Sequence, residues 1–307
     1  ILARNSMKNN FFSKLIAGVV LAATLGLSSA ARAASTSDTL VIIDESGSMG
    51  GEQAWIQNMI QALDVDLQAA GVTNNRYGLV GFGKGGSGRL GRSINVGSGL
   101  FGNAADFASA AANDLVTSGS FEDGYSGIDF ALNNYTFRGG AAKNIIFVTD
   151  EDRDNGNSGL NFASTLSSLQ SGGFLFNSVL NNPFSGTGGA GALGVDFENK
   201  AYYADGAGGV TSTPGGIVGN GFGSTETDYV PLSLQTRAAS WDLNQLRQGG
   251  LVAESFTKAF VDIKVQEIIT DPGDGTSVPE PASVIGLGVL AAAGAVSVKR
   301  KSQQRHS

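Results

Sequence analysis

Two short segments carry the side chains most able to do chemistry in this sequence. Asp44-Glu45-Ser46-Gly47-Ser48 directly follows the apolar run Leu40–Ile43, and Thr149-Asp150 ends a second apolar run that begins at Asn144. Continuous apolar runs of this length are typical of buried parallel strands, whose carboxyl ends meet at one edge of a sheet. Carboxylate and hydroxyl oxygens are ligands of small hard cations. We therefore expect a divalent-cation site formed by Asp44, Ser46, Ser48 and Asp150, with Gly47 permitting the turn.

The chain lacks the side chains that most other kinds of site require. It has no cysteine, and its one histidine is His306, next to the last residue. Ser-His-Asp and Cys-His nucleophiles, zinc sites built from thiolate or imidazole, and haem or iron–sulfur ligation are therefore excluded. Oxygen chemistry remains, either as cation binding or as glycoside cleavage by two carboxylates about 5 to 10 Å apart, such as Asp150 with Glu122 or Asp44.

The Asp-x-Ser-x-Ser pattern also has a purely structural interpretation. Ser46 or Ser48 could cap the helix that follows, with Glu52 in its first turn. A helix cap requires neither the buried strand before the motif nor the later Thr149-Asp150. A metal site at the edge of a sheet requires both, so these features favour a metal site.

Strands and helices alternate along the chain between these segments. The apolar patterns predict strands at 40–43, 76–82, 144–149 and 174–180, helices at 52–70, 103–115, 125–133 and 160–169, and a hairpin around 90–96. This alternation predicts an α/β fold with a doubly wound, mostly parallel sheet and helices on both faces. Residues 182–224 are glycine-rich and are expected to form a long surface insertion with room for a short hairpin, before 241–246 and 253–265 return as helix or as strand and helix.

These residues, in this order, resemble the von Willebrand factor type A domain and its metal-ion-dependent adhesion site. The resemblance spans roughly residues 39–265 and implies a doubly wound sheet with Mg²⁺ at its carboxyl edge. It also implies that Ser46 and Ser48 bind the cation directly through their hydroxyls, while Asp44 and Asp150 hold its waters or bind it directly. The family leaves one coordination position open, commonly for a carboxylate from a partner protein.

One expected ligand departs from the family pattern. Where the family usually supplies a threonine, this sequence has Gly119-Ser120-Phe121-Glu122-Asp123-Gly124, and Phe121 stands at the threonine position. Phenylalanine does not coordinate cations, so Ser120 or Glu122 would have to substitute. Eight acidic residues are expected near this edge, where they would favour Ca²⁺ and repel an acidic ligand: Asp44, Glu45, Glu122, Asp123, Asp150, Glu151, Asp152 and Asp154.

Both ends of the chain carry sorting features. Residues 1–6 precede a start at Met7, and residues 7–33 have the basic, apolar and A-x-A segments of a secretory signal peptide with cleavage after Ala33. A linker at 271–281 contains Pro279-Glu280-Pro281, and it is followed by an apolar run at 282–298 and a basic tail at 299–307. This order closely resembles a PEP-CTERM sorting signal, which implies cleavage by an exosortase and release to the outer surface or matrix. A permanent single-pass transmembrane helix with a cytoplasmic basic tail is the alternative.

The domain between the sorting features, residues 34–270, is acidic. The segment from Ala34 to Pro279 keeps 12 of the 20 basic residues and 26 of the 27 acidic ones, for a formal net charge of −14. Such a charge argues against nucleic acid and anionic lipid as partners and favours cations and basic partners. Without cysteine the exported chain has no disulfides, so its stability must come from core burial.

The features together predict a non-enzymatic, exported binding or adhesion protein. It would use Mg²⁺, or Ca²⁺ or Mn²⁺, to hold a protein or polysaccharide ligand at the cell surface, at the outer membrane or in the extracellular matrix. A structural matrix protein with a purely stabilising metal is the second interpretation, and a carboxylate-based glycoside hydrolase is the third. During export the expected partners are the Sec machinery, an exosortase and the inner membrane, which the C-terminal helix would enter.

Overall fold

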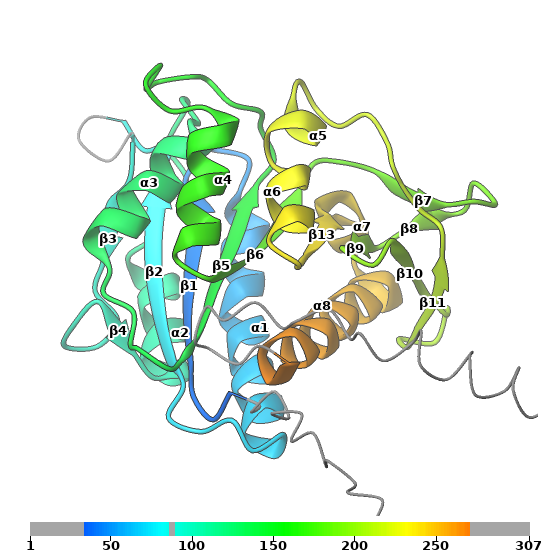
Figure 1. Cartoon of the computed structure of the whole chain (residues 1–307), viewed down its shortest axis with the longest axis horizontal. Coiled ribbons are helices and arrows are strands. Elements are labelled where there is room, and N and C mark those ends of the chain that lie inside the picture. Colours follow the sequence, from blue (N-terminus) through cyan, green and yellow to red (C-terminus); the bar gives the residue numbers. More distant parts are fainter. Residues whose placement is uncertain (1–33, 86–89, 271–307) are drawn as a thin grey trace, which may run out of the picture. The chain divides into compact units, whose positions relative to one another are not determined.

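The computed structural model describes residues 34–85 and 90–270, which form an α/β domain built on one large sheet (Figure 1). The predicted processing residues Ala33, Pro279, Glu280 and Pro281 lie outside the described residues, as do the predicted signal peptide and the apolar run 282–298. Within the described ranges, no helix combines the length and the apolar content that crossing a membrane requires.

Five parallel strands form the centre of a ten-stranded sheet. They lie in the spatial order β13 (Ala239–Asp242), β6 (Phe174–Leu180), β5 (Ala142–Thr149), β1 (Ser37–Asp44) and β2 (Arg76–Phe82). The predicted strands 76–82 and 174–180 are confirmed residue for residue, and 40–43 and 144–149 lie within longer strands. Because β1 pairs with β2 on one side and β5 on the other, the chain order reverses beside β1. Ligands of such sheets bind at the carboxyl edge of that point.

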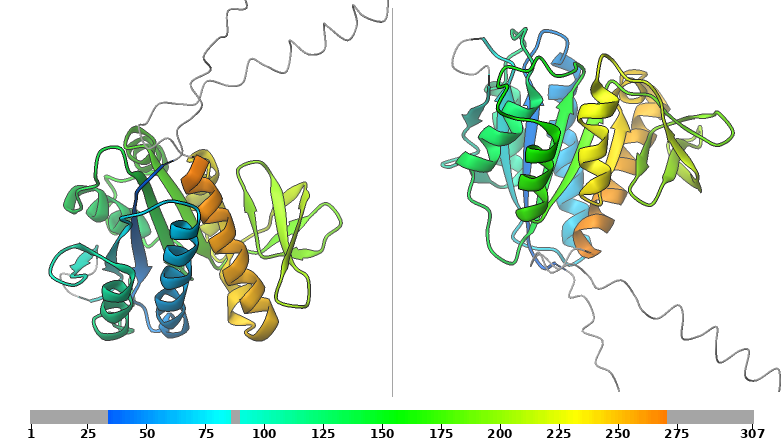
Figure 2. Two further views of the ribbon diagram at one scale, coloured as in Figure 1. Left: turned by 90° about the horizontal axis from the view of Figure 1, so that it is seen from below. Right: turned by 45° about the horizontal axis from the view of Figure 1, so that its top comes forward.

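Helices cover both faces of this sheet (Figure 2). One face packs against α1 (Gly50–Ala69), α2 (Ala104–Asn113) and α8 (Gly250–Thr270), and the other against α3 (Gly124–Asn134), α4 (Phe162–Ser171) and α6 (Val230–Gln235). Successive residues of β1 alternate between the two cores: Val41 and Ile43 face the first, and Leu40 and Ile42 the second. The predicted α/β fold with helices on both faces is therefore confirmed.

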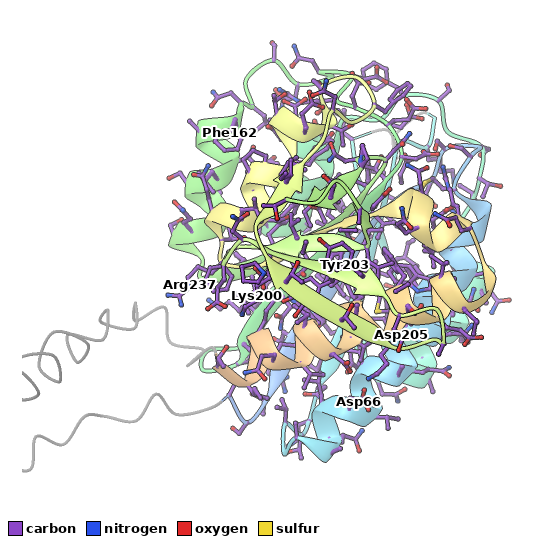
Figure 3. The ribbon with its side chains drawn as sticks, turned by 90° about the vertical axis from the view of Figure 1, so that its right-hand side faces the viewer. Asp66, Phe162, Lys200, Tyr203, Asp205 and Arg237 are labelled. Atoms are coloured by element: carbon purple, nitrogen blue, oxygen red, sulfur yellow. The ribbon has the colours of Figure 1, made fainter. Side chains whose placement is uncertain are left out.

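The edges of the sheet are antiparallel, so the sheet as a whole is mixed. Beyond β2, the hairpin expected around 90–96 is one short strand, β3 (Arg92–Ile94), which pairs with β2, as does β4 (Phe101–Gly102). Beyond β13, three strands continue the sheet: β9 (Gly194–Asp196), β10 (Lys200–Ala204) and β11 (Val210–Pro214). Figure 3 looks onto that second edge, with Lys200 and Tyr203 on β10 and Asp205 just after it.

The glycine-rich residues 182–224 therefore form more β-strands than we expected for a surface insertion with a short hairpin. Besides β9 to β11, they form a separate three-stranded sheet from β7 (Phe184–Gly186), β8 (Gly191–Ala192) and β12 (Gly216–Val218), and the short helix α5 (Thr225–Asp228) follows. Gly194 shows why glycine is needed, because a Cβ there would lie 2.6 Å from the Ser240 carbonyl oxygen on β13. Strands this short carry no readable alternation in sequence, and β9 pairs with a strand far along the chain.

Candidate metal-binding site

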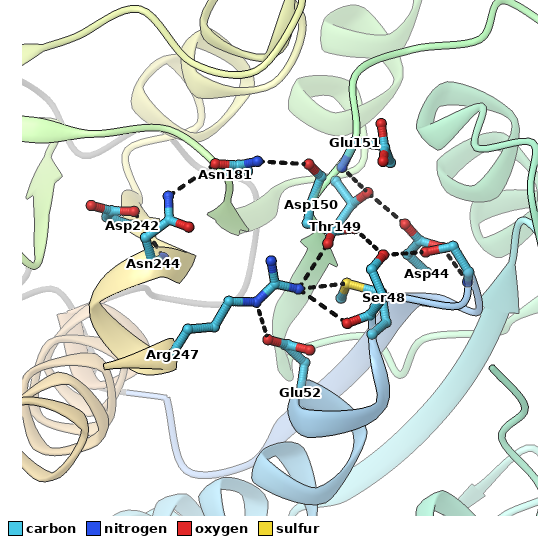
Figure 4. A network of polar contacts seen from close by, with 12 residues as sticks. Asp44, Ser48, Glu52, Thr149, Asp150, Glu151, Asn181, Asp242, Asn244 and Arg247 are labelled. Carbon is cyan, nitrogen blue, oxygen red and sulfur yellow. Dashed lines mark hydrogen bonds and ion pairs between the residues drawn. The ribbon is translucent and has the colours of Figure 1, made fainter. Parts of the chain in front are cut away.

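The four predicted ligands lie together at the carboxyl ends of β1 and β5 (Figure 4). Ser48 Oγ donates a hydrogen bond to Asp150 Oδ1 at 3.0 Å, although the two residues are 102 positions apart. Ser46 Oγ lies 3.1 Å from Ser48 Oγ, and the Ser46 amide donates to Asp44 Oδ1 at 2.7 Å. Asp44, Ser46 and Asp150 are buried, while Ser48 is exposed. The cluster of oxygens is therefore open to solvent on the Ser48 side.

Asp44 is a fully buried carboxylate whose partners are all uncharged. Besides the Ser46 amide, Thr149 donates from Oγ1 to Asp44 Oδ2 at 2.9 Å. No ion pair between described residues includes Asp44. Burial raises the pKa of Asp44 to about 7, against the lowering effect of the bonds from Ser46 and Thr149 and with a further raise from the charge of Asp150. The carboxylate thus lacks the positive charge that would offset its burial.

The conformation of the motif depends on a close approach at Gly119 and not on Gly47. The Glu45 carbonyl oxygen accepts hydrogen bonds from the amides of Ser118 and Gly119 at 3.0 and 2.9 Å. A Cβ at Gly119 would lie 2.2 Å from the Gly83 carbonyl oxygen, whereas a Cβ at Gly47 would meet nothing within 4 Å. The backbone of Gly47 is also not in the left-handed region. The expectation that Gly47 permits the turn is therefore wrong, because the turn suits an ordinary L residue.

This difference gives a matched pair of variants. Gly119→Ala is expected to lower the free energy of unfolding by about 1 to 3 kcal/mol, because two backbone segments must move apart. Gly47→Ala should change it by less than about 0.5 kcal/mol, as for a surface position without special contacts. Urea denaturation of both variants beside the wild type measures the difference. Equal losses in the two variants would contradict the assigned role of Gly119.

At the position of the missing threonine, the structure favours Glu122 over Ser120. Ser120 is exposed, whereas Glu122 is 7% exposed. A Cβ placed on Gly83 would lie 3.1 Å from Asp44 Oδ1 and 3.4 Å from Glu122 Cγ, so both acidic side chains border the same glycine. Burial, followed by the charges of Asp44, Asp154 and Glu151, raises the pKa of Glu122 to about 8. Glu122 therefore lies within electrostatic reach of Asp44.

Several of the eight acidic residues expected at this edge are engaged elsewhere. Glu45 points away from Asp44 because neighbouring strand residues face opposite sides, and its carboxylate binds Arg92 Nε at 2.7 Å. Asp123 binds Arg153 Nε at 2.8 Å. The carboxylates of Asp152 and Asp154 accept backbone amides of Ser224 and Glu122, respectively. Arginine side chains therefore offset the negative charges of Glu45 and Asp123.

Among residues 34–85 and 90–270, no three His, Cys, Asp or Glu side chains group in a way that could hold a metal ion. The predicted site is of a different kind, since it combines two carboxylates with two serine hydroxyls. Its donor atoms are all oxygens, which suits hard cations and not zinc.

The sequence reasoning missed Arg247, which reaches the site from α7 (Leu243–Arg247). Its Nη2 donates to Asp150 Oδ2 at 2.8 Å, and its Nε donates to Glu52 Oε1 on α1 at 2.6 Å. Nη2 also lies 3.3 Å from the Ser48 carbonyl oxygen. One guanidinium thus binds one oxygen of Asp150, while the other oxygen of that carboxylate faces Ser48. No local pattern could have revealed a contact between residues 97 positions apart.

Polar side chains also fix α7 against the end of β5. Asn244 Nδ2 donates to Asn181 Oδ1 at 2.9 Å, and Asn181 Nδ2 donates to the Asp150 carbonyl oxygen at 3.2 Å. Asp242 caps α7 by accepting the Asn244 amide at 2.9 Å. Figure 4 shows this chain of contacts running from α7 to the predicted ligands. The position of Arg247 is therefore set by two connections to β5 and one to α1.

No family model and no curated protein matches the sequence. Similar solved structures include proximal thread matrix protein 1 of the mussel byssus (16% identity, 48% of this chain and 38% of that chain, TM-score 0.38). They also include a von Willebrand factor type A protein from Catenulispora acidiphila (19% identity, 48% and 33%, TM-score 0.36). A third is the conserved hypothetical protein BatB from Bacteroides thetaiotaomicron (13% identity, 75% and 99%, TM-score 0.44).

This chain thus spans about a third of the length of the first two of these proteins. Because all three TM-scores lie below 0.5, the site is interpreted from its own geometry. That geometry belongs to a mixed, centrally parallel sheet with helices on both faces, which is consistent with the von Willebrand factor type A-like α/β fold.

Proposed function

We propose that this chain is a non-enzymatic surface or matrix protein that binds a protein or polysaccharide ligand through a divalent cation. The observation that carries the proposal is the contact between Ser48 Oγ and Asp150 Oδ1 at 3.0 Å. It joins the Asp-x-Ser-x-Ser turn after β1 to the end of β5, so that oxygen atoms from two strand ends face one point. Mg²⁺ is the proposed cation, with Ca²⁺ and Mn²⁺ as the alternatives.

The residues present fit a hard cation. Their donor atoms are two hydroxyls and two carboxylates, and the central carboxylate of Asp44 is fully buried without a basic partner among the described residues. A buried charge of this kind is costly unless it is paired or coordinates a metal. Gly83 leaves space beside Asp44 Oδ1 that a side chain at that position would fill.

Each residue has a definable task in such a site. Ser46 and Ser48 would contribute their hydroxyl oxygens, and Asp44 and Asp150 would contribute carboxylate oxygens directly or through water, with Glu122 in place of the missing threonine. When bound, the cation supplies a concentrated positive charge for an oxygen atom of the ligand. The Ser46 amide and Thr149 Oγ1 fix the two oxygens of Asp44, and Arg247 fixes Asp150 with one oxygen toward Ser48.

The export signals predicted at the two ends support a location outside the cytoplasm. In this proposal the chain leaves through the Sec machinery, its C-terminal segment enters the inner membrane, and an exosortase releases the protein to the surface or matrix. The acidic composition of the exported segment supports cations and not nucleic acid as partners.

Arg247 gives specific support to a second candidate function, a structural matrix protein. Its ion pairs to Asp150 and Glu52 connect α7, β5 and α1 at the carboxyl edge of the sheet. In this candidate function, a bound metal would further stabilise an edge that these ion pairs already hold together. The protein would then need no separate ligand.

A titration of the full chain with Mg²⁺, Ca²⁺ and Mn²⁺ by calorimetry tests the proposal. We expect a single ion per chain, removable by chelator, and metal-dependent retention of the folded protein on a resin carrying carboxylated polysaccharide or basic protein. A rise in melting temperature with the metal, but no metal-dependent retention on either resin, would support the structural candidate. Absence of binding by all three ions would overturn both.

A further inference from the structure

Three polar side chains are buried together between α8 and β6, away from the proposed metal site. Asn177 of β6 is 1% exposed, and Lys264 and Glu267 of α8 are 0% and 8% exposed. Glu267 Oε2 accepts a hydrogen bond from Asn177 Nδ2 at 2.7 Å and lies 3.1 Å from Lys264 Nζ. One carboxylate oxygen thus contacts both an amine and a carboxamide nitrogen.

The surroundings of this cluster are aromatic and buried. Trp241 donates from Nε1 to Asn177 Oδ1 at 3.4 Å, and its ring packs 5.6 Å from Phe260 and from Tyr202. Glu267 Oε1 is buried and makes no hydrogen bond with any described residue. Burial raises the pKa of Glu267, although Lys264 and Asn177 oppose that shift. Because both side chains are buried, a charged pair between them carries a large desolvation cost.

We propose that Lys264 and Asn177 react with each other to form an intramolecular amide bond, with Glu267 carrying the proton. The lone pair of Lys264 Nζ would attack Asn177 Cγ and form the new carbon–nitrogen bond. One proton passes from Nζ to Glu267, which returns a proton to Asn177 Nδ2. The bond from Cγ to Nδ2 then breaks. An amine and a carboxamide become a secondary amide and one ammonia, without oxidation or reduction.

The neighbouring groups suit each step of this reaction. The shared oxygen of Glu267 lies between the nitrogen that must lose a proton and the nitrogen that must gain one. The indole of Trp241 donates to the carbonyl oxygen on which negative charge develops as the amine adds. The fold holds all of these groups in place within the domain, which removes the entropic cost of bringing them together.

The bond would provide a covalent connection that this chain otherwise lacks. It has no cysteine, so no disulfide restrains it outside the cell. The amide would join α8, the last described helix, to β6 in the centre of the sheet, and it would restrict the unfolded chain as a disulfide does. Unlike a disulfide, it would be insensitive to reducing agents.

Peptide mass spectrometry of the full chain, denatured and digested with trypsin, tests the proposal. We expect the peptide that contains Asn177 to be joined to the peptide that contains Lys264, at the sum of the two peptide masses less one ammonia. Trypsin should fail to cleave after Lys264, since its amine is acylated. Lys258 on the same helix forms only an exposed pair with Asp262, so cleavage there is the internal control.

Two variants separate the reaction from a simple buried ion pair. Glu267→Gln keeps the size of the side chain but removes the proton carrier, and it should restore cleavage after Lys264. Asn177→Asp should still form the bond by releasing water in place of ammonia, and its linked product should have the same mass as the linked wild type. Complete cleavage after Lys264 in folded wild type would overturn the proposal. An unchanged linkage in Glu267→Gln would overturn the role of Glu267. If that variant does not fold, cleavage after Lys264 in the wild type still decides whether the bond forms.

Discussion

Asp44→Asn is expected to weaken Mg²⁺ binding by at least about 100-fold, because even changes to the partners of metal ligands typically cost 10- to 100-fold. The substitution removes the negative charge of the carboxylate at the centre of the site and keeps its size. The Asn oxygen still accepts the Ser46 amide, so the turn is expected to keep its shape. Calorimetric titration of wild type and variant with Mg²⁺ under the same conditions measures the loss.

The stability of this variant separates lost binding from lost folding. Because burial raises the pKa of Asp44 to about 7, its charged form is disfavoured in the folded chain, and Asp44→Asn should raise the melting temperature of the metal-free protein above pH 7. Asp262→Asn is the matched control, since it removes one charge from an exposed pair with Lys258 on α8. Asp262→Asn should bind Mg²⁺ like the wild type. An equal loss in both variants would mean that overall charge, and not the site, holds the cation.

Asp38→Ala is expected to lower the free energy of unfolding by about 3 to 5 kcal/mol, the usual effect of removing one partner from a buried ion pair. Asp38 is fully buried at the start of β1, and its carboxylate accepts from Arg76 Nε at 2.9 Å and from Arg138 Nε at 2.8 Å. Without Asp38 the two guanidinium groups would lose their shared carboxylate and keep only backbone carbonyl acceptors. Urea denaturation measures the loss. Glu198→Ala, which breaks an exposed pair with Lys200, should cost less than about 1 kcal/mol.

The same carboxylate predicts a dependence of stability on pH. Burial alone would raise the pKa of Asp38, but hydrogen bonds from Arg76 and Arg138 and the charge of Arg138 outweigh it and hold the pKa below its ordinary value. A carboxylate with a lowered pKa in the folded state stabilises the fold fully above its unfolded pKa of about 3.9, and this contribution is lost as the pH falls further. The stability difference between wild type and Asp38→Asn should therefore be constant near neutral pH and shrink below about pH 4. A difference unchanged in strong acid would contradict this role of Asp38.

The central strands and the proximity of the four proposed ligands could be predicted because their signals are local. β1 and β5 contain the continuous apolar runs 40–43 and 145–148, and such runs have few alternatives to a buried strand. The end of a parallel strand fixes where the next residue lies, so Asp44 and Asp150 could be placed at one edge from sequence alone.

The rest depends on contacts that no local pattern records. Arg247 reaches Asp150 only because Asn181 and Asn244 hold α7 in place, and the strands β9 to β11 exist only where β13 offers an edge. Glu45 is a different case, since a signal was available. It follows Asp44 at the end of a strand, and neighbouring strand residues face opposite sides, so the two acidic side chains could have been assigned to different faces.

The direction of α8 determines how the site is presented. The helix begins at Gly250, three residues after Arg247, and its 21 residues extend about 30 Å to Thr270, close to where β1 begins (Figure 2). The described chain therefore enters and leaves the domain on the side remote from Asp44 and Ser48. Attachment to a cell or a matrix through either flank would orient the serine hydroxyls outward, toward whatever approaches from the surrounding medium.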